Sequence, residues 1–414
     1  MLDFPPLIWP AMMVATLAGC SQGGDAVVVA TTWGPSERRA LGDEFRAWLA
    51  GRAGEGPSRL EWVGLDPRED LDEAAGRIGG VDVVLGATSG GVIARRSRIA
   101  LALRPGAEPP PSSWDALGEP SARDRLALDD PRDDPATLAL ASARLRALGW
   151  PRGYAWLVRL AANARPIGRG RGSALATLGR RGADWAVLGE SRGMPLEFSD
   201  LDPSIVCDEV VRRVDDAPHP ERAGAFVRFL RERSKNPALT PALSRGERGE
   251  DGHPLPPGEG RGEGLPQDNP LLADLLGATL VDEQDELRPA WESVIKTGRP
   301  GAWEARLTVA PPWPPASVTQ LIRRHAAAGE DPGPWVETLA NQVAADPFAR
   351  VWLLTTWGRD PRPIDGRFLD ELLQAADGRL AADSTFRAWL RAEWTAWAGQ
   401  RYRWVARRAG GPPS

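Results

Sequence analysis

The feature that most constrains the fold is a regular alternation of β-rich runs and amphipathic helical stretches over residues 26–233. The first run, Ala26–Trp33, is a continuous series of β-branched and small residues, which is typical of a strand buried on both faces. The stretch 34–50 follows it, and its large apolar residues recur at helical spacing. Strands and helices that alternate in this way form a parallel sheet with helices on its faces. The sequence therefore predicts an α/β fold.

The same pattern continues through the rest of this region. Further strands are predicted at Arg59–Leu65, Val81–Gly91, Arg125–Pro131, Ala183–Ser191 and Ser204–Val214. Further helices are predicted at about 69–78, 133–149, 153–164, 172–182 and 219–233. Asp134 is a suitable N-cap with Pro135 at the first helical position. A proline-rich crossing at Pro109–Leu117 separates two αβ units, which predicts two lobes with a cleft between them.

The first twenty residues have the character of an export signal. An apolar stretch of about ten residues is too short to span a membrane and ends in small residues. Its last residues, Leu17 to Cys20, resemble a bacterial lipobox, in which the cysteine is acylated and becomes the new N-terminus. We therefore expect residues 1–20 to be a lipoprotein signal peptide and Cys20 to be the lipid-attachment residue. The alternative is an ordinary apolar segment, since the leader has no Lys or Arg and contains Asp3.

The order of motifs between 26 and 233 resembles a known family. The segments VVVATTW, VDVVLGATSG, SSWDAL, RLALDDP, GYAWLVRLAANA, GADWAVLGES and APHPERAGAFVRFL follow one another as in the extracellular solute-binding proteins of ABC transporters, especially the branch that includes ferric-iron binders. The resemblance implies a type 2 periplasmic-binding-protein fold that closes on a small solute and delivers it to a membrane permease. Lobe I would comprise about 26–108 and 200–233, and lobe II about 120–199.

Candidate solute-binding residues follow from a rule of open α/β sheets, in which ligands bind beyond the carboxyl ends of the strands and at helix starts. The residues that this rule selects are Thr32, Trp33, Ser36, Thr88, Ser89, Thr137, Ser173, Glu190 and Ser191. Their hydroxyl groups and amides could replace the water around a polar or anionic solute. The alternative for each is a capping or turn residue that contacts no ligand.

The ferric-iron function of the resembling branch is not expected here. Those iron binders use a late pair of tyrosines, whereas Tyr154 falls on a predicted helix and Tyr402 lies far outside the predicted lobes. The segment Arg165–Ser173 could offer guanidinium groups to an anion, or could be a solvated basic loop. We expect a small polar or anionic solute.

The stretch 234–270 interrupts the pattern. It is rich in Gly, Pro, Glu and Arg and has almost no apolar periodicity, so it cannot bury enough surface to offset its ordering entropy. We expect a disordered low-complexity insert.

Residues 271–414 are predicted to be helical. Ten of the 18 tryptophans lie there, between Trp291 and Trp404, and many fall on broad apolar helix faces. The favoured interpretation is an all-α region with an aromatic core packed on the lobes. The alternative is a docking surface for a partner or a membrane, because Trp and Arg favour both.

Charge and residue types exclude other functions. The net charge of -5 is spread along the chain, which argues against a nucleic-acid binder. The histidines and cysteines have no metal-ligand spacing and form no catalytic arrangement, so we expect no metal, no cofactor and no enzymatic activity. The sequence thus predicts a lipid-anchored binding protein outside the cytoplasm that serves an ABC permease. The rival prediction is an envelope-anchored interaction or sensing protein that uses the C-terminal helices.

Overall fold

The computed structural model describes most of residues 26–235 and 269–410. The described residues are 26–31, 33, 35–52, 59–65, 71–87, 91–169, 172–189, 196–199, 201–235, 269–297, 300–312, 320, 322–325, 334, 335, 337, 338, 341 and 363–410. The predicted signal peptide and nearly all of the predicted disordered insert lie outside these residues.

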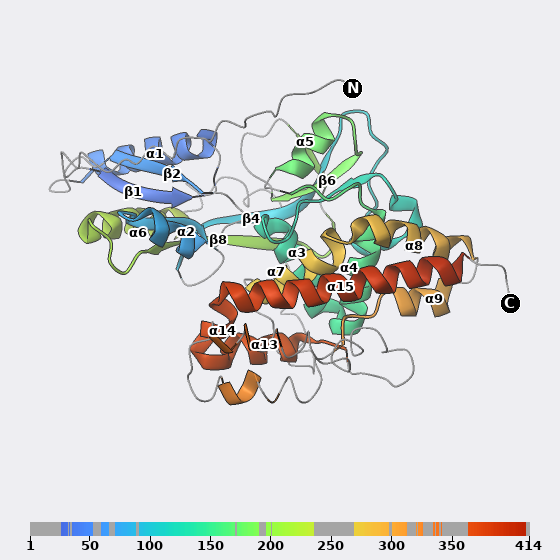
Figure 1. Cartoon of the computed structure of the whole chain (residues 1–414). Coiled ribbons are helices and arrows are strands. Elements are labelled where there is room, and N and C mark those ends of the chain that lie inside the picture. The colour runs from blue at the N-terminus through green and yellow to red at the C-terminus, as the bar shows by residue number, and fades with distance from the viewer. Residues whose placement is uncertain are drawn as a thin grey trace, which may run out of the picture.

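Lobe I contains three parallel strands, with β1 between β2 and β3. Helices α1 and α6 cover one face of these strands through Leu41, Phe45 and Phe226, and α2 covers the other face through Ala75. In Figure 1 these strands and helices lie together at the left end of the molecule. The elements are β1 (Ala26–Thr31), α1 (Pro35–Ala50), β2 (Arg59–Gly64), α2 (Leu71–Ile78), β3 (Val83–Ala87) and α6 (Pro220–Lys235). Each was predicted from the sequence within a few residues.

Two long antiparallel strands, β4 (Val92–Leu103) and β8 (Ile205–Arg213), connect the lobes. At one end β8 pairs with β3 of lobe I, and at the other end β4 pairs with β6 of lobe II. The result is one eight-stranded sheet in the order β2-β1-β3-β8-β4-β6-β5, with β7 paired to β4. The lobes are therefore joined by continuous hydrogen-bonded strands.

Lobe II contains the remaining strands of this sheet. Helix α5 packs on one face, and α3 packs on the other together with α4. Asp134 caps α3 as predicted, since its carboxylate accepts a hydrogen bond from the Thr137 amide. The elements are η1 (Asp115–Gly118), η2 (Pro120–Ala122), β5 (Leu126–Ala127), α3 (Pro135–Leu148), α4 (Trp150–Asn163), α5 (Ser173–Gly179), β6 (Trp185–Gly189) and β7 (Glu197–Ser199).

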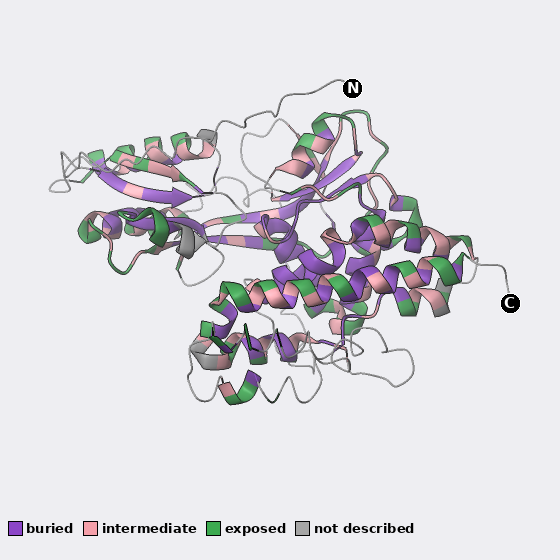
Figure 2. Cartoon of the chain, viewed as in Figure 1, coloured by how far each residue is buried: buried purple, intermediate pink, exposed green. Residues whose placement is uncertain are grey.

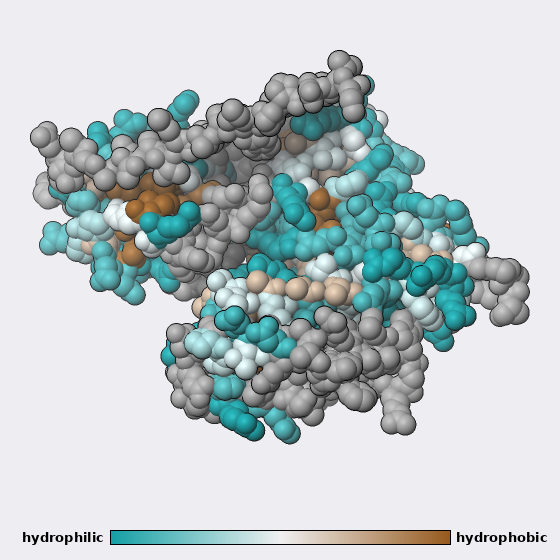
Figure 3. All heavy atoms as spheres, in the orientation of Figure 1, coloured by the Kyte–Doolittle hydropathy of each residue, from teal (hydrophilic) through white to brown (hydrophobic). Residues whose placement is uncertain are grey.

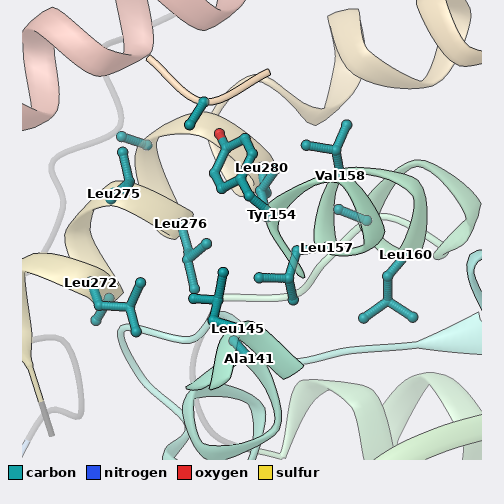
Figure 4. Packing of buried hydrophobic residues seen from close by; sticks show 14 of the residues in the cluster. Ala141, Leu145, Tyr154, Leu157, Val158, Leu160, Leu272, Leu275, Leu276 and Leu280 are labelled. Atoms are coloured by element: carbon teal, nitrogen blue, oxygen red, sulfur yellow. The ribbon is translucent and has the colours of Figure 1, made fainter. Parts of the chain in front are cut away.

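The C-terminal helical region packs on lobe II and shares its core. Buried side chains of α3 and α4 form one cluster with those of α7, α8 and α15, and Figure 4 shows Tyr154 of α4 among leucines of both parts. The region therefore extends lobe II. Its elements are α7 (Pro270–Leu276), a π-helical segment (Gly277–Val281), α8 (Gln284–Lys296), α9 (Pro300–Leu307), α13 (Gly366–Gln374), η4 (Ala375–Gly378), α14 (Arg379–Ala382) and α15 (Ser384–Ala409).

The sequence pattern missed β4, β7 and α9. Strand β4 reads as a mixed segment because Arg95, Arg96 and Arg98 interrupt its apolar run. In the structure Arg95 and Arg96 pair with carboxylates of β8 on the two faces of the sheet. The predicted crossing at Pro109–Leu117 overlaps η1, and the long strands between the lobes are β4 and β8.

Burial follows this architecture. In Figure 2 β1, β6, α3 and α4 are mostly buried, whereas α15 carries both buried and exposed residues along its length. Figure 3 shows mostly hydrophilic residues over α8 and the C-terminal end of α15, and near-neutral to weakly hydrophobic residues along the rest of α15. Among the helices that the structure describes, none combines the length and apolar character required to span a membrane.

Candidate functional site

The carboxyl ends of the strands in the two lobes point toward each other. In lobe I, β3 runs along β8 and ends opposite Val210, and β1 runs parallel to β3. In lobe II, β6 runs along β4 in the opposite direction and ends with Gly189 opposite Ile99, and β5 runs parallel to β6. The two sets of strand ends therefore flank the middle of β4 and β8. This is the position at which open α/β sheets bind ligands.

On the lobe I side, Trp33 follows β1 and is 3% exposed. Its amide donates a hydrogen bond to Thr31 Oγ1 at 3.1 Å. Arg38 Nε of α1 donates to the Trp33 carbonyl oxygen at 2.6 Å, so α1 fixes the backbone that leaves the strand. Trp33 was selected from the sequence, and the structure places it at the predicted strand end.

Between the lobes, a charged cluster occupies one face of β4 and β8, which we call the crossing strands. Arg95 of β4 is paired in register with Glu209 of β8, and its guanidinium forms ion pairs with Glu209 and with Glu37 of α1. The same guanidinium lies 4.5 Å from the centre of the Trp33 ring, within cation–π distance. Two carboxylates thus surround one cation, so Arg95 is already neutralised by the protein.

On the lobe II side, carboxylates occupy the starts of two helices. Asp134 accepts hydrogen bonds from both the amide and the hydroxyl group of Thr137, each at 2.8 Å. Asp129 accepts from the amides of Gly172 and Ala174 at 3.0 and 2.6 Å. These amides are the groups that would bind an anion at a helix start. They are instead bonded to side chains of the protein.

The start of α3 lies close to the crossing strands. A Cβ atom added to Gly189 would lie 3.4 Å from Ser97 Cβ of β4 and 3.9 Å from Ala136 Cβ of α3. Ser97 is paired in register with Cys207 of β8, and both residues are buried. The end of β6, the start of α3 and the middle of β4 therefore meet on one face of the sheet.

Only part of the predicted site lies in the described residues. Trp33 and Thr137 flank the crossing strands from the two lobes, and Ser173 is the first residue of α5. The residues or side chains outside the described part are those of Cys20, Thr32, Ser36, Thr88, Ser89, Glu190 and Ser191.

The sequence reasoning missed Arg95, Glu209 and Asp129 as residues of this region. Arg95 and Glu209 lie within strands, where the strand-end rule does not look. A charged residue inside each of two apolar strands is the signal that could have identified them, because such residues are rarely buried without a partner.

Arginines of the basic segment Arg165–Ser173 contact the protein itself. Arg165 Nε donates to the carbonyl oxygen of Asp124 at 2.9 Å, and Arg169 pairs with Asp282 at 3.1 Å. These contacts engage two of its guanidinium groups with the protein, which does not favour an anion-binding role for the segment.

The two tyrosines converge, contrary to the expectation that Tyr402 lies far from the lobes. The Tyr154 hydroxyl group donates to Thr279 Oγ1 and the Tyr402 hydroxyl group donates to the Thr279 carbonyl oxygen, both at 2.9 Å. Tyr154 and Tyr402 are far apart in the sequence but close in space, because α15 folds back onto lobe II. Burial raises the pKa of both phenols above the ordinary value, so they are neutral and unsuited to bind ferric iron as phenolates. In the described ranges, no group of three or more His, Cys, Asp or Glu residues could hold a metal ion.

Comparison with solved structures gave matches at low identity, each with a TM-score below 0.5. A periplasmic thiamin binding protein is 18% identical, with 53% of this chain and 82% of that chain covered and a TM-score of 0.42. Iron-bound HitA from Pseudomonas aeruginosa is 15% identical, with 50% and 81% covered and a TM-score of 0.40. AfuA from Actinobacillus pleuropneumoniae with bound fructose-6-phosphate is 13% identical, with 50% and 79% covered and a TM-score of 0.42. Comparison with curated proteins gave no match.

A family model gives the most direct similarity. Residues 82–240 match the model described as bacterial extracellular solute-binding protein. The matched segment includes both crossing strands and all of lobe II up to the C-terminal helical region. The family consists of binding proteins and not of enzymes, in agreement with the sequence prediction. Residues 82–240 are thus similar to the bacterial extracellular solute-binding proteins, and they lie within a two-lobed α/β fold that continues into an all-helical C-terminal region.

Proposed function

We propose that the protein captures a small polar solute between its lobes, outside the cytoplasm, and delivers it to an ABC permease. The observation that supports this most is the opposed arrangement of strand ends across β4 and β8. Trp33 follows β1 in lobe I, and Thr137 lies in the first turn of α3 in lobe II. The crossing strands would be the hinge about which the lobes close.

The charges around the site bear on the two solute classes that the sequence left open, polar and anionic. The amides at the starts of α3 and α5 are bonded to Asp134 and Asp129, and Arg95 is paired with two glutamates. An anion would find these donors occupied and carboxylates beside them. The described contacts therefore support a neutral polar solute over an oxyanion.

A lipid anchor at Cys20 is part of the proposal. It rests on the lipobox-like end of the leader, followed by a domain of an extracellular family. The C-terminal helices are assigned a packing role, because Trp291, Trp394 and Trp397 are buried in the core shared with lobe II.

A thermal-shift screen of the chain from residue 20, with Cys20→Ser, tests the function. The probes are neutral sugars and polyols, phosphate and sulfate, divalent metals, and polyamines. A ligand at about 100 times its Kd stabilises the folded state by about 2.7 kcal/mol, which gives a clear rise in melting temperature. A rise with a sugar or polyol supports the proposal. A rise with phosphate or sulfate alone would refute the neutral solute, and no rise with any probe would refute solute capture.

A further inference from the structure

Arg132 links the turn that precedes α3 in lobe II to the C-terminal helical region. Its guanidinium donates to the Asp130 carboxylate at 2.6–3.1 Å and to both carboxylate oxygens of Asp282 at 2.7 and 2.9 Å. Asp130 precedes α3, whereas Asp282 follows the π-helical segment. The Arg132 side chain is 20% exposed and that of Asp130 is 2% exposed. This is therefore a largely buried bridge between two distant parts of the sequence.

Arg132 packs closely against the π-helical segment. A Cβ atom at Gly277, the first residue of the π-helical segment, would lie 2.3 Å from Arg132 Nε. Arg169 forms a second ion pair with Asp282 at 3.1 Å. Burial alone would lower the pKa of Arg132, but its hydrogen bonds to Asp130 and Asp282 outweigh burial and raise that pKa. The guanidinium is thus held as a cation in one position.

Asp130 connects Arg132 to the start of α3. Its carboxylate accepts a hydrogen bond from the Arg132 amide at 2.9 Å, and its carbonyl oxygen accepts from the amides of Asp133 and Asp134 at 2.9 Å each. Asp134 then caps α3 through the Thr137 amide. The turn from 130 to 134 is therefore fixed at one end by Arg132 and fixes the helix start at the other.

The neighbouring residue, Asp129, holds the start of α5 in the same way. Its carboxylate accepts from the amides of Gly172 and Ala174, and its backbone forms a bridge with Gly168. The turn 129–134 thus carries the residues that hold two helix starts of lobe II. Of these, the start of α3 lies against the crossing strands.

We propose that Arg132 is a positioning residue that, together with Asp282, lets the C-terminal helical region set the geometry of the turn 129–134, which holds the start of α3 at the proposed solute site. This inference rests on the proposed solute site. The C-terminal helices contribute to solute binding without touching the solute, because they hold the guanidinium that holds the turn.

The test compares two substitutions in the helical region of the full-length chain. Asp282→Asn weakens the bridge to Arg132. Asp274→Asn is the matched control, since Asp274 of α7 is likewise bonded by two arginines, Arg387 and Arg391, but does not contact the turn. Amide hydrogen exchange is measured at Thr137, Gly172 and Ala174, and probe affinity is measured with one sugar, glucose, and with phosphate, spermidine and thiamin.

Asp282→Asn should speed exchange at these three amides by about tenfold or more, while exchange in α1 stays unchanged. It should also weaken binding of whichever named probe the unaltered protein binds. Asp274→Asn should lower the melting temperature but leave these amides protected. If Asp282→Asn leaves the amides as protected as Asp274→Asn does, the proposal is wrong.

Arg132→Lys gives a second variant in case Asp282→Asn fails to fold. Lysine keeps the charge but cannot form the paired hydrogen bonds of the guanidinium, so exchange at Thr137 should still rise. Unchanged exchange in Arg132→Lys would count against the proposal. If the unaltered protein binds none of the four probes, the proposed solute capture loses support, and the exchange measurements still decide the role of Arg132.

Discussion

Arg95 and Glu209 lie directly opposite each other on the two strands that cross between the lobes, and their side chains form an ion pair. The Glu209 side chain is 4% exposed. The next pair along the strands, Arg96 and Asp208, lies on the other face of the sheet, where the Arg96 side chain is 47% exposed. The same two strands therefore carry a buried and an exposed ion pair side by side.

Arg95→Met should destabilise the protein by about 3 kcal/mol, because it removes a cation from a buried carboxylate. Arg96→Met, the matched control, should cost less than about 1 kcal/mol, because solvent screens the exposed pair. Urea unfolding of both variants measures the difference. Equal losses of unfolding free energy would show that the burial of the Arg95 pair has no energetic consequence.

The buried phenols make the free energy of unfolding depend on pH in the alkaline range. Burial raises the pKa of Tyr154 in the folded state, while the unfolded value stays near about 10. Above that pH the unfolded phenol loses its proton and the folded one keeps it, so the free energy of unfolding falls as pH rises. Burial lowers the pKa of the neighbouring Arg401 to about 10, which acts in the opposite direction.

Tyr154→Phe isolates the contribution of this phenol. The free energies of unfolding of Tyr154→Phe and the unaltered protein should converge as pH rises from about 9 to about 11. Only the unaltered protein has the Tyr154 hydroxyl proton, which its unfolded state releases in this range, so its free energy of unfolding falls more steeply. Urea unfolding across this range measures the difference. A difference that stays constant with pH would contradict the assigned burial.

Gly277→Ala should destabilise the protein by about 1–3 kcal/mol, because the added methyl group would overlap Arg132 in a packed interior. Gly301→Ala is the control, since a Cβ atom there meets nothing within 4 Å. It should be neutral or stabilising by up to about 1 kcal/mol. Thermal unfolding of the two variants provides the comparison, and similar melting temperatures would argue against close contact at Gly277.

Cys20→Ser should release the protein from membranes, because acyl chains supply about 0.8 kcal/mol per buried CH₂. Cys207→Ser is the control, as Cys207 is buried on β8 and has no part in anchoring. Fractionation of cells that express each variant measures the effect. Retention of Cys20→Ser in the membrane fraction would mean that another part of the chain holds the protein there.

The sequence was sufficient for elements whose signals are local. The β-branched run of β1 and the Asp134–Pro135 start of α3 both appear where predicted. Burial on both faces and helix capping each give a sequence signal that is confined to a few residues. The strand-end rule also selected Trp33 and Thr137, which flank the crossing strands.

Features that depend on distant parts of the chain could not be predicted. Arg95 and Glu209 become partners only through the register of β4 and β8, and nothing near either residue in the sequence identifies the other. The same holds for Tyr154 and Tyr402, whose meeting at Thr279 requires α15 to fold back across α4. Periodicity reports which face of a helix is buried, but not which element covers it.

The shared core of lobe II has a consequence for the order in which the chain can fold. The main cluster of lobe I uses residues from Val27 to Leu230, so it can close once α6 is available. The cluster of lobe II begins at Ile99 and ends at Ala409 of α15. Contacts across so long a sequence separation form slowly. Lobe II therefore stays incomplete until α15 has been synthesised, whereas lobe I can be finished well before.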